Sequence, residues 1–246
     1  MKVLHDLGEY ILLMSKTFSI PDKWSMFFKQ ISKETYKLGI DSLWIVILIS
    51  IFIGAVVVLQ IALNIQSPII PAFTVGYVTR EIVTLEFSST IMCLILAGKV
   101  GSNIASEIGT MRVTEQIDAL EIMGVNSASY LILPKIVAFM LFMPCLVAFS
   151  LFFGIMGGYF ICFATKIITV SHYEYGLLYW FNPFNIWYSI IKGVCFAFII
   201  ASIASYFGYN IKGGALQVGK ASTNSVVMSS VIILTFDLII TQLILS

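Results

Sequence analysis

Residues 42–66 read SLWIVILISIFIGAVVVLQIALNIQ, and this stretch decides the fold class. It lies in a longer run, between Asp41 and Arg80, that contains no charged residue. A helix of about 20 apolar residues is long enough to cross the hydrocarbon layer of a bilayer. The stretch therefore predicts a membrane-spanning helix over residues 42–66, which Pro68 and Pro71 then end.

The composition of the whole chain agrees with a membrane protein. Of its 246 residues, 59% are hydrophobic and 11% are charged, whereas soluble domains average about 25% charged residues. So few charges cannot cover the surface of a soluble globule. Composition therefore excludes an ordinary soluble enzyme, a disordered chain and a nucleic-acid binder with a basic face. The formal net charge of +1 says nothing about partners.

Four further runs predict spanning helices, so we expect an all-α integral membrane protein with about five transmembrane helices. The runs cover residues 87–106, 136–165, 185–209 and 224–245. Residues 1–41 differ, because apolar residues recur there at helical spacing among charged ones. This pattern predicts N-terminal amphipathic helices at the membrane interface, with a break at Pro21 and Asp22, although a solvated helix packed on its own protein fits too.

The distribution of positive charge predicts the orientation. With the N-terminus in the cytoplasm, only Arg80, Lys166 and Lys192 fall on the outer side of the five spans. All other lysines and arginines then lie on the inner side, as the positive-inside rule requires. The segment 167–188, rich in tyrosine, tryptophan and phenylalanine, is then an aromatic belt at the outer interface.

No catalytic or metal-binding motif occurs in the sequence. The four cysteines lie far apart in apolar runs, and the two histidines are isolated. Residues 214–220, GALQVGK, match the pattern of a phosphate-binding loop, but Ala221 follows where a serine or threonine should contact magnesium. We therefore expect no catalytic residue, no metal and no bound cofactor in this chain.

A polar segment between the second and third spans predicts an amphipathic helix over residues 107–124. Its apolar positions share one face, its charged positions occupy the others, and Gly124 is a natural stop. Such a helix either caps its own bundle or lies in a groove of a soluble partner. The candidate coupling residues are Glu107, Arg112, Val113, Glu115, Ile117, Asp118, Leu120 and Glu121.

The segment 107–138, EIGTMRVTEQIDALEIMGVNSASYLILPKIVA, closely resembles the signature of the MlaE family, permease subunits of ABC-type lipid transporters. Residues 208–223, GYNIKGGALQVGKAST, and 231–237, VIILTFD, resemble two further family motifs. The resemblance covers about residues 42–246, which would form the permease domain. At the family's Arg-Glu-Leu-Gly-Pro position the chain has LEFSS over 85–89, and Arg80-Glu81 lies earlier. Either Glu81 or Glu86 can therefore hold the family's glutamate role.

The resemblance implies a function and partners. It implies a homodimer in the cell inner membrane that moves phospholipid between this membrane and a periplasmic carrier of the MCE type (MlaD-like). It implies a separate MlaF-like ATPase, which binds ATP and magnesium and docks on the 107–124 helix. An MlaB-like STAS-domain protein is a possible further subunit. The alternatives from other classes are a secondary transporter or channel that works alone, and a membrane scaffold.

Two groups of residues complete the predicted site. Ile53, Val57, Gln60 and Asn64 fall on one face of the first span, apolar at its inner part and polar at its outer end, and with Glu86 they are expected to line a lipid cavity. An ordinary helix–helix contact explains that face as well. Lys192 and Asp237 lie at similar depth in the last two spans, so they are expected to form an intramembrane ion pair or to share a polar network.

Overall fold

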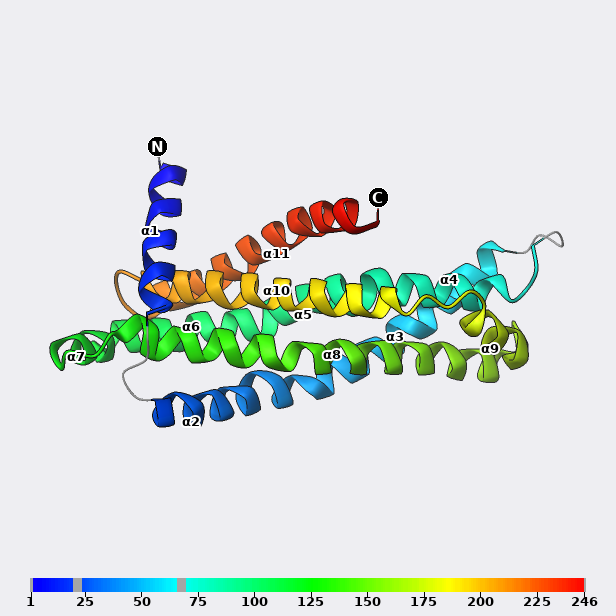
Figure 1. The fold of residues 1–246 in the computed structure, drawn as a ribbon, viewed down its shortest axis with the longest axis horizontal. Helices are drawn as coiled ribbons and strands as arrows, with labels where there is room; N and C mark the ends of the chain where they lie inside the picture. Colours follow the sequence, from blue (N-terminus) through cyan, green and yellow to red (C-terminus); the bar gives the residue numbers. More distant parts are fainter. Residues whose placement is uncertain (1, 20–23, 66–69, 246) are drawn as a thin grey trace. The chain divides into compact units, whose positions relative to one another are not determined.

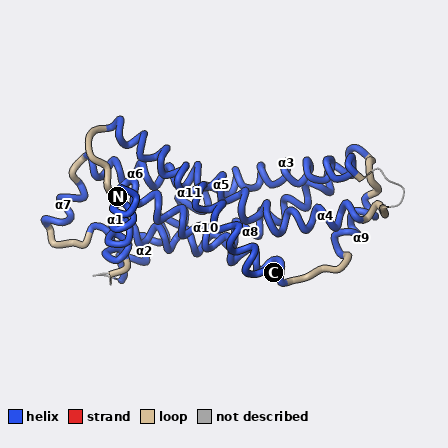
Figure 2. The backbone as a smooth tube through the Cα atoms, turned by 90° about the horizontal axis from the view of Figure 1, so that it is seen from above, coloured by secondary structure: helices blue, strands red, loops and turns tan. Residues whose placement is uncertain are grey.

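The computed structural model describes residues 2–19, 24–65 and 70–245, and every regular element in them is a helix (Figure 2). Five helices are long and apolar enough to cross a membrane: Trp24–Asn64, Thr74–Val113, Ser127–Thr165, Phe184–Tyr209 and Ala215–Leu243. Each contains one of the predicted spans or nearly all of it, so the all-α, five-span prediction is confirmed. The predicted breaks at Pro21, Asp22 and Pro68 lie outside the described residues.

Two of these long helices are built from consecutive segments (Figure 1). The first joins α2 (Trp24–Glu34), the wider π-helical turns of η1 (Thr35–Ile40) and α3 (Asp41–Asn64). The second joins α4 (Thr74–Ile82), η2 (Val83–Ile91), α5 (Met92–Leu96), η3 (Ala97–Gly101) and α6 (Ser102–Val113). The second N-terminal helix is thus continuous with the first spanning helix.

The remaining elements are single helices. They are α1 (Lys2–Thr17), α7 (Gln116–Ile122), α8 (Ser127–Thr165), α9 (Val170–Leu178), α10 (Phe184–Tyr209) and α11 (Ala215–Leu245). The chain divides into two compact units whose boundaries cut the long helices. Residues 1–42, 93–142 and 194–243 form unit 1, and residues 43–92, 143–193 and 244–246 form unit 2.

Unit 1 places α1 on α10. Tyr10 donates a hydrogen bond to Oγ of Ser202 over 2.9 Å and packs edge-on against Tyr206, and Phe18 stacks on Phe198. Figure 1 shows α1 running across the direction of α6 and of this part of α10. Because of these contacts, the N-terminal helix is part of unit 1. Its predicted place at the membrane interface, and the division of the chain at residues 41 and 42, stay predictions.

Small residues allow close helix packing within each unit. In unit 1, Ala97, Gly101 and Ala105 are buried, and a side chain at Gly208 would meet the carbonyl oxygen of Ala105. In unit 2, side chains at Gly54 and Gly157 would collide with the backbones of α8 and α3. Small residues therefore allow helices to approach each other closely within the chain.

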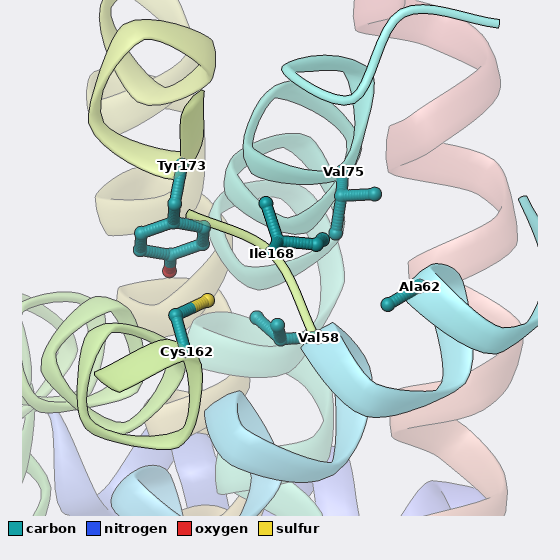
Figure 3. Close-up of a cluster of buried hydrophobic side chains, with 6 residues drawn as sticks. All are labelled: Val58, Ala62, Val75, Cys162, Ile168 and Tyr173. Atoms are coloured by element: carbon teal, nitrogen blue, oxygen red, sulfur yellow. The ribbon is translucent and has the colours of Figure 1, made fainter. Parts of the chain in front are cut away.

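Unit 2 has an apolar core around Tyr173, which α9 carries. Its ring is buried with Val58, Ala62, Val75, Cys162 and Ile168 (Figure 3). Its hydroxyl donates a hydrogen bond to the carbonyl of Ile155 over 3.2 Å, so the polar atom is satisfied. Residues from α3, α4, α8 and α9 meet in this core, which fixes α9 beside α4.

Candidate functional site

The polar loop between the second and third spanning helices forms a short helix set apart by a sharp turn. α6 ends at Val113, and Glu115 then takes the left-handed backbone conformation, with φ at 60°. α7 follows over Gln116–Ile122, and Gly124, with φ at 78°, ends it. The prediction of one continuous helix over 107–124 was therefore wrong. A residue in the left-handed conformation cannot continue a right-handed helix, so α6 stops here.

Charged and aromatic side chains hold α7 in place after this turn. Nη1 of Arg112 lies 2.6 Å from Oδ1 of Asp118, so an ion pair joins α6 to α7. The guanidinium of Arg112 also lies over the ring of Tyr209. Oε1 of Glu121 accepts hydrogen bonds from Tyr209, over 2.9 Å, and from Ser127, over 2.8 Å. α7 is thus anchored to the ends of α6, α8 and α10.

The apolar side chains that α7 exposes differ from those predicted. Ile117 has no exposed surface, and Val113 and Leu120 are half-buried, so Ile117 cannot fill a groove on another protein. Ile122 is 87% exposed and Met123 69% exposed. The candidate contact surface of this loop is therefore its tip, Ile122–Met123, together with the exposed Glu115. Exposure of Ile122 and Met123 was not predicted, because the assignment of residues to faces assumed an unbroken helix over residues 107–124.

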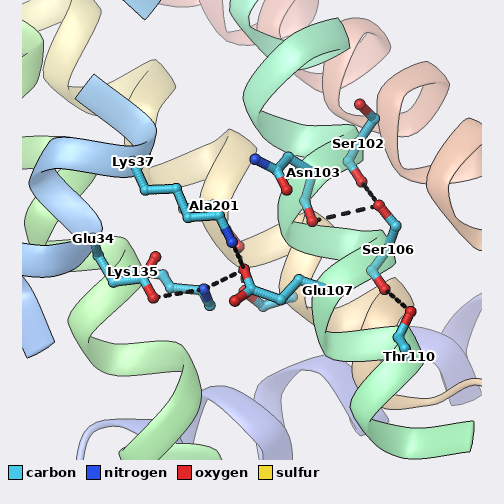
Figure 4. Close-up of polar contacts among 10 residues, drawn as sticks. Glu34, Lys37, Ser102, Asn103, Ser106, Glu107, Thr110, Lys135 and Ala201 are labelled. Carbon is cyan, nitrogen blue, oxygen red and sulfur yellow. Dashed lines mark hydrogen bonds and ion pairs between the residues drawn. The ribbon is translucent and has the colours of Figure 1, made fainter. Parts of the chain in front are cut away.

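Behind this loop, four charged side chains form one network, which we name the α6 ion cluster: Glu34, Lys37, Glu107 and Lys135 (Figure 4). Nζ of Lys135 lies 2.8 Å from Oε1 of Glu34 and 2.6 Å from Oε2 of Glu107. Nζ of Lys37 lies 2.9 Å from the same oxygen of Glu107. Of the predicted site residues only Glu107 belongs to it, because Glu34, Lys37 and Lys135 are far from Glu107 in sequence and no spacing pattern links them.

The predicted lipid-facing residues of α3 do not share one environment. Val57 is buried and Ile53 is half-buried inside unit 2, while Gln60 and Asn64 are exposed. That all four line one lipid cavity stays a prediction, with Val57 the least exposed of them. Six exposed positions recur every four residues along α3, so that two polar residues continue an apolar ridge. This ridge consists of Trp44, Leu48, Phe52, Val56, Gln60 and Asn64.

Glu86 lies in η2 and pairs with a buried lysine of α10. Its Oε1 is 3.3 Å from Nζ of Lys192, whose side chain has no exposed surface, while 42% of the Glu86 side chain is exposed. Lys192 also contacts the carbonyl of Leu85 and the ring of Tyr188. The pairing of Lys192 with Asp237 stays a prediction, because Asp237 belongs to the other unit.

The other candidate glutamate, Glu81, belongs to a different cluster. It accepts hydrogen bonds from Arg80, over 2.6 Å, and from Asn185, over 3.0 Å. Nη1 of Arg80 also donates to the carbonyls of Leu177 and Tyr179, each over 2.8 Å, at the end of α9. Arg80 and Glu81 therefore join α4 to α9 and α10, and of the two glutamates Glu86 has the more exposed side chain.

The glycine-rich stretch that matches a phosphate-binding loop has another role. Gly213, with φ at 121°, makes the turn before α11, and residues 215–220 form the first turns of that helix. A phosphate-binding loop connects a strand to a helix, and the described residues include no strand. This stretch is therefore the turn and the start of α11.

Fold and site together define a multi-pass helical membrane protein with a short exposed helix between its second and third spanning helices. Residues 31–243 match the family model described as Permease MlaE. The chain is 33% identical over 242 residues to a probable ABC transporter permease protein of Rickettsia bellii, covering 98% of this chain and 93% of the relative.

Two further relatives have the same description. The Rickettsia prowazekii protein is 32% identical over 254 residues, covering 99% of this chain and 98% of the relative. The Porphyra purpurea protein is 35% identical over 200 residues, covering 80% of this chain and 74% of the relative. The chain belongs to the MlaE family of permeases.

Proposed function

We propose that this chain is the membrane-spanning permease subunit of an ABC transporter that moves phospholipids between the inner membrane and a periplasmic carrier. The exposed tip Ile122–Met123 is the single observation that supports it best. Two large apolar side chains at the end of an anchored helix fit a hydrophobic pocket on a soluble partner. The relatives described as ABC transporter permeases make an ATPase the expected occupant of this surface.

The ATPase and this chain have separate roles in the proposed transporter. ATP and magnesium bind to the partner ATPase, and this chain acts as a transporter subunit without a catalytic residue of its own. Glu115 at the turn fixes the orientation of the partner by charge, since exposed charges contribute more to specificity than to affinity. The contacts of Arg112, Asp118 and Glu121 fix α7 to its neighbours. A displacement of the tip is therefore transmitted to α6 and α8.

The proposed lipid path uses the exposed ridge of α3. Its inner part is apolar and suits acyl chains, and Gln60 and Asn64 at its outer end suit a headgroup. The exposed part of Glu86 is a further polar contact on the same unit.

A second copy of the chain closes this path in a homodimer. A carrier of the MCE type binds outside, a STAS-domain protein is a further subunit, and the N-terminus is cytoplasmic.

An Ile122→Asp variant tests the docking surface. A charge placed in an apolar pocket without a partner costs several kcal/mol, so we expect the variant to insert in the membrane but to lose the ATPase on affinity purification. Leu178→Asp, which changes an equally exposed apolar side chain on α9, is the control and should retain the ATPase. A variant that retains both the ATPase and lipid transport contradicts the proposal.

A Val56→Trp variant tests the lipid path separately. Val56 is exposed on the ridge of α3, so a larger side chain there narrows the path without disturbing the interior of unit 2. We expect ATP-dependent movement of a fluorescent phospholipid in proteoliposomes to fall while the ATPase stays bound. Transport at the wild-type rate argues that the ridge is an ordinary lipid-facing or helix-packing surface. Transport without any ATPase favours the stand-alone transporter.

A further inference from the structure

The α6 ion cluster has features that packing alone does not require. The side chain of Lys135 is 3% exposed and that of Glu34 is 7% exposed. Burying such charges is costly, and an apolar set of similar volume is often as stable or more stable. Oε2 of Glu34 is buried without a hydrogen-bond partner among the described residues. A cluster with this cost is better explained by a need for fixed geometry than by stability.

The cluster joins three segments that are distant in sequence, and each leads into a spanning helix. Glu34 and Lys37 lie where α2 meets η1, and that helix continues without a loop into α3. Lys135 lies in α8, which begins at Ser127. Glu107 lies in α6, which ends at the turn that carries α7. The cluster is therefore the point where the loop helix is tied to the first and third spanning helices.

Glu107 is the member that makes this connection. One oxygen, its Oε2, lies 2.6 Å from Lys135 and 2.9 Å from Lys37. Charge-assisted contacts of this length are short and strong, so they resist changes in distance between helices. Without Glu107, the pair of Lys135 and Glu34 still joins α8 to α2, but α6 loses its ionic link to both.

We propose that Glu107 is a positioning residue that transmits movement of α6 and α7 to the first and third spanning helices. It contacts neither the ATPase nor the lipid. It acts by holding Lys135 and Lys37 at a fixed distance from α6, so that their helices move together with α6. This inference rests on the proposed function. It goes beyond that function by separating the surface that binds the ATPase from the residues that convert its movement into transport.

The test uses the full complex in proteoliposomes with three readouts: retention of the ATPase, ATP hydrolysis and ATP-dependent movement of a fluorescent phospholipid. Glu107→Gln keeps the shape of the side chain and removes its charge. We expect it to retain the ATPase and to hydrolyse ATP, while lipid movement falls about tenfold, as for a lost coupling between two sites. Glu174→Gln, an exposed carboxylate on α9, is the control and should match the wild type.

Each result decides for or against the inference. Lipid movement in Glu107→Gln at the wild-type rate overturns it, and so does loss of the ATPase, because the cluster would then only support the docking surface.

Should Glu107→Gln fail to accumulate, Lys37→Gln removes one contact at the exposed edge and leaves the buried pair intact. Reduced transport in that variant supports the inference, and unchanged transport overturns it. A wild-type complex without ATP-dependent transport instead contradicts the proposed function.

Discussion

Among single residues, the pair of Glu86 and Lys192 makes a quantitative prediction. Glu86→Gln removes a carboxylate that lies 3.3 Å from a fully buried ammonium group. Breaking an ion pair with both partners buried costs about 3–5 kcal/mol, and we expect about 1–3 kcal/mol here because Glu86 is partly exposed. Lys192→Met should cost less, since the remaining carboxylate belongs to a side chain that is partly exposed. Thermal unfolding in detergent measures both variants, and the reverse order contradicts this account.

Asp237 can be tested in the same system. The sequence places it at the depth of Lys192, and a shared polar network makes the effects of two substitutions depend on each other. We expect the changes in unfolding free energy for Lys192→Met and Asp237→Asn to be non-additive in the double variant. Simple addition of the two single effects would show that these charges do not interact.

Glu121 gives a prediction about pH. Hydrogen bonds from Ser127 and Tyr209 lower the pKa of Glu121 from its ordinary value of 4.5. A carboxylate with a lowered folded-state pKa stabilises the fold above its unfolded pKa, and this contribution is lost as pH falls through the folded value. We therefore expect α7 to loosen in acid. Hydrogen exchange of residues 116–122, corrected for the intrinsic rate, measures this.

The Glu121→Gln variant is the control for the pH effect. Its amide cannot ionise, so α7 should already be looser at neutral pH, and its protection should fall less in acid than that of the wild type. Equal protection of the wild type and the variant at neutral pH would show that Glu121 does not anchor α7.

For helices, the contact of α3 with α8 predicts the effect of one added methyl group. A Cβ at Gly54 would overlap the carbonyl oxygen of Gly154, and a backbone atom cannot rotate away. Overpacking of this kind costs about 1–3 kcal/mol, so Gly54→Ala should lower the unfolding temperature. Gly98→Ala, with nothing within 4 Å of its new Cβ, should not lower it. Equal unfolding temperatures for the two variants contradict this packing.

The sequence predicted the spanning helices well and the loop between them less well, for physical reasons. Charge-free runs mark spans because a charge in hydrocarbon is costly, so the five runs located the five helices. The break at Glu115 has no such signal, since left-handed backbone is uncommon for glutamate. The spacing of Arg112 and Asp118 suggested different faces of one helix, whereas the turn brings them together. Glu34, Glu107 and Lys135 meet only through tertiary packing.

For the whole molecule, orientation is the prediction to test. In a background where Cys93, Cys145, Cys162 and Cys195 are replaced, Ser171→Cys on α9 and Met123→Cys at the loop tip place single thiols at exposed positions. Positive charges favour the cytoplasmic side for the tip. A membrane-impermeant maleimide should therefore label Ser171→Cys in intact spheroplasts and Met123→Cys only after lysis. The opposite labelling pattern reverses the topology.

The positions of the segments of units 1 and 2 in the sequence also determine which of the two units is completed first during synthesis. Both long segments of unit 2 have been synthesised once residue 193 is made, whereas unit 1 still lacks residues 194–243. α11 is the last helix of unit 1 to be synthesised; its residues Ala221, Ser225 and Ser229 are buried, and Oγ of Ser222 donates a hydrogen bond to the carbonyl of Ser102 in α6. A nascent chain that stalls before α11 leaves the opposing surface of unit 1 uncovered. The packing of unit 1 is therefore completed only after residues 215–243 have been made.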